Sequence, residues 1–138
     1  MLEAPIRVHR IALARDSGGP GTHRGGLGGV FEYELLDGEA TVTYRGERHL
    51  CDAEGVADGM AGGRASAVIK RAGGGEEVIK SKLVATLRKG DRMVIATAGG
   101  GGHGMPAERD PALLQADLRN GKVSLEAARE FYGYRGNV

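Results

Sequence analysis

The chain has 138 residues, a length that predicts one domain spanning residues 1–138. Lysine and arginine total 19 against 18 acidic residues, so the charge balance favours neither a nucleic-acid nor a membrane partner. One cysteine, no signal-peptide pattern and no long apolar run together predict a cytoplasmic protein. Glycine supplies 25 of the residues, where roughly 7 per cent is ordinary. Such a chain loses much backbone entropy on folding, so we expect either partial disorder or a partner that supplies additional burial.

The first predicted element is the extended stretch IRVHRIALA. Ile6 and Val8 alternate with polar residues, whereas Ile11 and Leu13 continue the alternation in the opposite phase. Because the side chains of a strand alternate between its two faces, this change of phase predicts an interruption near Arg10.

Three turns are expected between the strands that follow. VFEYELL and ATVTYRGER alternate on either side of Asp37-Gly38, which predicts a β-hairpin. SAVIKR and EEVIK flank three glycines and predict a second hairpin with a looser turn. Two further apolar runs, within residues 82–98, flank a third candidate turn at residues 89–91.

The chain changes character after residue 105, where we expect a β part (1–105) to give way to a helical tail (106–138). Asp110 can cap a helix that begins at Pro111, and Ser124 can cap a second one. The predicted fold class is mainly β, an antiparallel sheet or barrel-like domain of six or seven strands with a short C-terminal helical hairpin.

Two glycine-rich segments require a test for phosphate binding. Residues 99–104, GGGGHG, match the dinucleotide fingerprint after a strand-like run, but Pro106 follows and no strand comes after the helix. Residues 16–29, DSGGPGTHRGGLGG, lack the lysine and the hydroxyl of a phosphate-binding loop. A lysine between methionines, the usual biotin-attachment pattern, is also absent. We therefore expect no cofactor to be bound by this chain.

Few residues are candidates for chemistry, and none is assigned a catalytic or metal-binding role. His49-Leu50-Cys51 is too short a pattern for a structural zinc site. His103, flanked by glycines, could meet a ligand or be plain surface. Arg24 could pair with a carboxylate or phosphate and Asp16 could start a local turn with Ser17, and a structural role is favoured for both.

Three stretches taken in order carry a family resemblance: DSGGPGTHRGGLGGVFEYELL, KGDRMVIATAGGGGHGMPAERDP and GKVSLEAAREFYG. They resemble the C-terminal portion of the hydantoinase B, oxoprolinase and acetone or acetophenone carboxylase family, from about Ile6 to Gly133. The resemblance implies that the glycine-rich stretches are extended, polyproline-II-like and closely packed. Valine in place of Gly26 or Gly101 is then expected to block assembly. Family chains are several times longer, so we expect a split-off small subunit or a fragment.

The resemblance also implies a function. The chain is most like the small, gamma-type subunit of the acetophenone carboxylases. Such a complex would convert an aryl ketone and bicarbonate to a β-keto acid, benzoylacetate, without biotin. The chain would have a mainly structural role, while larger hydantoinase A-like and hydantoinase B-like subunits would hold ATP with a divalent metal. One alternative is a subunit of an ATP-dependent hydrolase acting on hydantoins or 5-oxoproline. Another is a stand-alone β binding module.

Overall fold

A computed structural model describes residues 5–136 of the chain. The described part is mainly β, as predicted, with two short helices at its C-terminal end. The strands are β1 (Ile6–Leu13), β2 (Gly29–Leu35), β3 (Glu39–Arg45), β4 (Ser66–Lys70), β5 (Glu76–Ile79), β6 (Lys82–Arg88) and β7 (Arg92–Ala96). A 3-10 turn, η1 (Pro106–Glu108), precedes the helices α1 (Pro111–Arg119) and α2 (Leu125–Tyr132).

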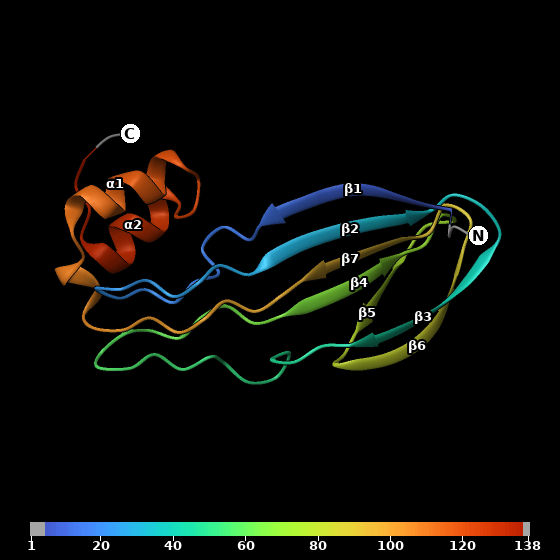
Figure 1. The fold of residues 1–138 in the computed structure, drawn as a ribbon, viewed down its shortest axis with the longest axis horizontal. Coiled ribbons are helices and arrows are strands. Elements are labelled where there is room, and N and C mark those ends of the chain that lie inside the picture. Colours follow the sequence, from blue (N-terminus) through green and yellow to red (C-terminus); the bar gives the residue numbers. More distant parts are fainter. Residues whose placement is uncertain (1–4, 137–138) are drawn as a thin grey trace.

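The strands form two layers. Five of them make one antiparallel sheet in the order β1-β2-β7-β4-β5, and β3 pairs with β6 in a separate ribbon (Figure 1). The sheet ends at β1 on one side and at β5 on the other, so the described strands form an open arrangement and not a closed barrel. The interruption predicted near Arg10 is confirmed, because the β1–β2 register shifts between Val8 and Arg10.

The hairpin predicted through Asp37-Gly38 is wrong. The turn exists, with Gly38 at φ +68, but β2 pairs with β1 and β7 while β3 pairs with β6. Both edges of β2 are therefore occupied inside the sheet. β3 crosses to the second layer, where its apolar alternate residues can face the sheet from the other side.

The other two predicted turns are confirmed. β4 and β5 form a hairpin through the glycines at 73–75, and Gly90, at φ +84, lies in the turn that leads from β6 into β7 in the other layer. Asp91 links these two turns. Its buried carboxylate accepts hydrogen bonds of 2.8–3.0 Å from the amides of Ala72 and Arg88 and from Arg71 Nη1. Burial alone would raise the pKa of Asp91, but these donors lower it below its usual value.

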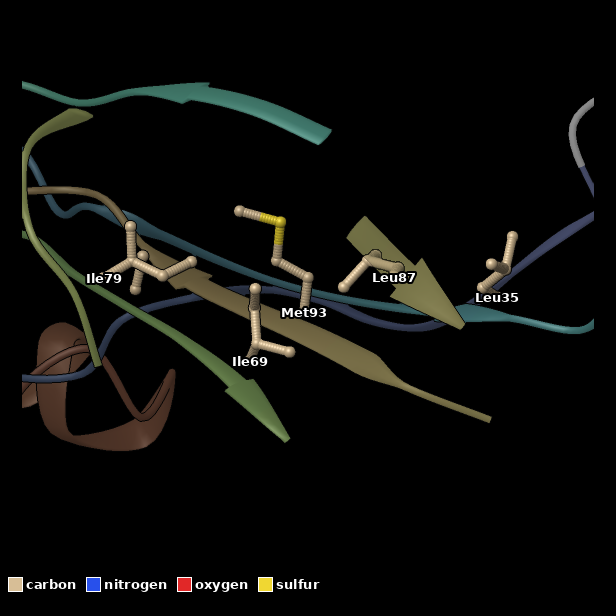
Figure 2. Close-up of a cluster of buried hydrophobic side chains, with 6 residues drawn as sticks. Leu35, Ile69, Ile79, Leu87 and Met93 are labelled. Atoms are coloured by element: carbon tan, nitrogen blue, oxygen red, sulfur yellow. The ribbon is translucent and has the colours of Figure 1, made fainter. Parts of the chain in front are cut away.

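The main core fills the space between the two layers (Figure 2). Ile69, fully buried, and Met93 project from the sheet, and Leu87 projects from the ribbon. The remaining buried members are Leu35, Ala67 and Ile79.

The helical tail forms at the predicted residues. The Asp110 carboxylate accepts from the amide of Ala112, the Ser124 hydroxyl accepts from the amide of Ala127, and Gly133 ends α2 at φ +67. A second, separate cluster of buried side chains joins the helices: Leu114, Val123, Ala128 and Tyr132. Among residues 5–136, the helices are too short to cross a membrane.

Candidate functional site

Three extended segments lie between the sheet and the helical tail, and we call them the glycine layer: residues 14–28, 53–63 and 97–104. They run alongside one another between the strands and the helices (Figure 1). The amide of Gly19 donates to the carbonyl of Gly100 at 2.8 Å, Met60 donates to Pro20 at 2.8 Å, and Gly102 donates to Met60 at 2.9 Å. Main-chain hydrogen bonds between distant parts of the sequence therefore hold this layer together.

Glycine is required in the layer because backbones touch where a side chain would lie. A Cβ added at Gly101 would overlap the carbonyl oxygen of Glu54, and one added at Gly99 would overlap that of Ser17. In both cases the obstacle is main chain, which is held by its own hydrogen bonds and yields less readily than a flexible side chain. The close packing expected at Gly101 is thus present within this chain.

Gly26 differs, and the expectation of close packing there is wrong for the described chain. A Cβ added at Gly26 would meet nothing within 4 Å. The residue contributes its carbonyl, which accepts from the amide of Gly100 at 2.9 Å, and any residue type can supply that group. Contact of Gly26 or Gly101 with another subunit stays a prediction.

The amides of one glycine-rich segment of the layer are already paired with carbonyls of this chain. A phosphate cradle needs several amides that point toward the ligand. In the segment that matches the dinucleotide fingerprint, the amides of Gly99, Gly100, Gly102, His103 and Gly104 all donate to carbonyls of this chain at 2.9–3.0 Å. These amides hold the layer together and are not available to a nucleotide.

His103 lies on the exposed rim of the layer beside His23. The two residues exchange main-chain hydrogen bonds of 2.9 Å, and their ring centroids are 6.0 Å apart. Within residues 5–136, no group of three or more histidine, cysteine, aspartate or glutamate side chains could hold a metal ion. The pair can offer hydrogen bonds or proton exchange to a ligand. Sequence reasoning missed His23 as the neighbour of His103, because a pairing between residues so far apart leaves no local signal.

Arg24 pairs with a carboxylate of its own chain. Its Nε lies 3.0 Å from Asp117 Oδ2 and its Nη2 lies 3.3 Å from Oδ1, while Arg109 Nη2 donates to the same carboxylate at 2.8 Å. The three side chains are only 13%, 7% and 8% exposed for Arg24, Asp117 and Arg109. Burial alone would raise the pKa of Asp117, but the two arginines lower it below its usual value. This ion cluster attaches α1 to the glycine layer, and sequence reasoning did not identify Asp117 or Arg109.

Asp16 also joins the layer to the helical tail. It has a left-handed φ of +61, and its Oδ1 accepts from the amide of Ser124 at 2.7 Å. Ser17 makes the local turn, because its hydroxyl donates to the carbonyl of Ala14 at 2.6 Å. The side chains of Arg24 and Asp16 therefore both have structural partners in this chain.

The fold and its central layer define a β domain in which hydrogen-bonded glycine backbones connect a sheet to a helical end. A family model, hydantoinase B/oxoprolinase, matches residues 2–106, and the chain belongs to that family. The beta subunit of caprolactamase from Pseudomonas jessenii is 40% identical over an alignment of 134 positions that covers 94% of this chain and 23% of that protein. The B subunit of a putative D-/L-hydantoinase from Pseudomonas sp. (strain NS671) is 33% identical over an alignment of 132 positions that covers 94% of this chain and 22% of that protein. The chain thus spans about a quarter of the length of these relatives.

Solved structures share the fold. The ATP-dependent caprolactamase from Pseudomonas jessenii matches 96% of this chain and 24% of its own, with a TM-score of 0.81 at 33% identity. An acetone carboxylase in its nucleotide-free state matches 94% of this chain and 21% of its own, with a TM-score of 0.72 at 19% identity. At that identity the second likeness establishes the fold and says nothing of the chemistry.

Proposed function

We propose that this chain is a small subunit of an ATP-dependent enzyme complex that hydrolyses a cyclic amide, such as a lactam or a hydantoin. The observation that carries the proposal is the 40% identity to the caprolactamase beta subunit over 94% of the chain. The hydantoinase relative supports the same class of substrate, since hydantoins are also cyclic amides. Fold and identity both connect this chain to enzymes that act on such rings.

The role of the chain within the complex would be structural. Arg24 and Asp16 are occupied by partners in the chain itself, and the glycine amides hold the layer together. ATP and its divalent metal would therefore bind to larger hydantoinase A-like and hydantoinase B-like subunits, and no biotin would take part.

Acetophenone carboxylation, the activity implied by the resemblance, is the second candidate. The acetone carboxylase likeness supports it through the fold. We place hydrolysis of a cyclic amide first because sequence identity is higher to the caprolactamase and hydantoinase subunits than to the carboxylase.

The test is purification of the affinity-tagged chain from its native cells, with co-purifying subunits identified by mass spectrometry. ATP hydrolysis by the complex is then measured with caprolactam, with hydantoin, with 5-oxoproline, and with acetophenone plus bicarbonate. Stimulation by a cyclic amide is the expected result. Stimulation by the ketone and bicarbonate alone would favour the carboxylase. A monomer that purifies without larger subunits and melts cooperatively would instead support the stand-alone binding module.

A further inference from the structure

The edge strand β1 presents four large apolar side chains to solvent. Ile6 is 49% exposed, Val8 51%, Ile11 68% and Leu13 58%. One edge of β1 pairs with β2, and the other has no strand partner among residues 5–136. Natural sheets usually protect such an edge with charged residues or a covering segment. The four apolar side chains on one face of this edge strand are therefore unusual for a surface that stays in water.

A bulge gathers these side chains on one face of the strand. The register places Ile6 opposite Leu35, Val8 opposite Tyr33, and Ile11 opposite Phe31 on β2. Residues directly opposite each other in an antiparallel pair share a face. The register shift between Val8 and Arg10 adds one residue to β1. Because of this extra residue, Ile11 and Leu13 lie on the same face as Ile6 and Val8. All four apolar side chains consequently lie on the face that carries the main core.

The opposite face of β1 is polar. Arg7 and Arg10 lie opposite Glu34 and Glu32, and Arg7 Nη1 is 3.7 Å from the Glu34 carboxylate. His9 also contacts Glu34, at 2.5 Å. The two faces therefore differ clearly in polarity, and the charged face is the one suited to solvent.

The ribbon covers only part of the apolar face. Side chains of β3 and β6 pack over those of β4, β5 and β7 in the main core, whereas the four β1 side chains stay open. Next to the β1 side chains is a groove of about 530 Å³. Phe31 and Tyr33 of the sheet line it, together with Tyr44 of the ribbon and Arg48 of the loop after β3. The rings of Phe31 and Tyr33 stack with centroids 6.5 Å apart. We call the four β1 side chains and this groove the open apolar face.

We propose that the open apolar face is the docking surface for the larger hydantoinase B-like subunit, which would lay an extended apolar segment against β1. This inference rests on the proposed function. The relatives are about four times longer than this chain, so the larger subunit would supply the remaining length, and an apolar segment of it would cover the exposed side chains of β1. An exposed strand edge beside an apolar groove fits the addition of a strand from a partner.

Charge disfavours a second copy of this chain as the occupant. β1 contains Arg7, His9 and Arg10 but no acidic residue. A two-fold symmetric pairing of β1 with itself would bring Arg7 and Arg10 of the two copies close together, where like charges repel. The proposal therefore requires the segment that pairs with β1 to carry acidic residues.

The test compares variants of the tagged chain within the complex purified from native cells. Lysine in place of both Ile11 and Leu13 should reduce recovery of the hydantoinase B-like subunit about tenfold or more, because two charges would lie in a buried interface. Val78→Lys is the matched control, since Val78 is apolar and 77% exposed on β5, at the edge of the sheet opposite β1. It should leave recovery unchanged. Circular dichroism checks that each variant is folded.

A photo-reactive benzophenone amino acid at the position of Ile11 provides an independent measurement that leaves the charge unchanged. It should cross-link to the hydantoinase B-like subunit. A cross-link to a second copy of this chain, or only to the hydantoinase A-like subunit, would overturn the proposal, as would normal assembly of the double lysine variant. In those cases the unmodified complex still shows its ATP hydrolysis, so the proposed function stands. If the unmodified chain recovers no larger subunit, both proposals fail.

Discussion

Removal of the Asp117 carboxylate should release the helical tail from the glycine layer. Asp117→Ala would leave Arg24 and Arg109 without their shared counter-ion, although their side chains are only 13% and 8% exposed. Breaking a buried ion pair by deletion of one partner costs about 3–5 kcal/mol, because the remaining charge stays buried and uncompensated. A whole domain has only about 5–15 kcal/mol of stability. The loss is thus large enough for the tail to open before the sheet unfolds.

Urea unfolding and hydrogen exchange measure this effect. We expect the amides of α2 to lose protection in the Asp117→Ala variant while those of β4 and β7 keep theirs. Asp37→Ala is the matched control, because Asp37 pairs with Lys89 at 3.5 Å but is 77% exposed. Such a surface pair contributes no more than about 1 kcal/mol. Equal small losses in the two variants would refute the structural role assigned to the ion cluster.

Three further outcomes are expected. The pKa of Asp117 is lowered in the folded state, so its ionised carboxylate stabilises the fold above the unfolded-state pKa of about 3.9, and this stabilisation is lost as pH falls through the folded-state pKa. The protection factors of the α2 amides, which are corrected for the intrinsic pH dependence of exchange, should therefore fall below about pH 4, and less so in Asp117→Asn. Gly101→Ala should destabilise by about 1–3 kcal/mol or more in urea unfolding, whereas Gly26→Ala should be neutral or stabilising by up to about 1 kcal/mol; equal losses would contradict the packing described. Ile69→Ala, at a fully buried position, should cost about 2–5 kcal/mol by the same measurement, and a loss below about 1 kcal/mol would contradict its place in the core.

Features with a local cause could be predicted from the sequence. The caps at Asp110 and Ser124 depend on a side chain that reaches an amide two or three residues away. The turn of the β4–β5 hairpin and the bulge near Arg10 depend on glycine spacing and on the phase of alternation. In each case the residues that determine the structure are neighbours in the chain.

The features that could not be predicted depend on contacts between residues far apart in the sequence. Asp37-Gly38 has the composition of a hairpin turn, but the strand pairing was decided by which faces had to be buried, and β3 pairs with β6 across separations of 37 to 49 residues. Arg24 meets Asp117 across a separation of 93 residues. Gly26 and Gly101 look alike in sequence, yet only Gly101 has a carbonyl where its Cβ would lie. None of these contacts follows from spacing or composition.

The glycine layer also gives a physical reason to expect the partner proposed above. A layer of closely packed backbones makes many hydrogen bonds, each of which adds only about 0.5–1.5 kcal/mol net, and it buries few apolar side chains. Within residues 5–136 the buried hydrophobic side chains form two small, separate clusters, while glycine increases the entropy lost on folding. Covering the half-exposed side chains of β1 would add roughly 25 cal/mol per Å² of apolar surface removed from water. Docking of the proposed partner should therefore stabilise this chain.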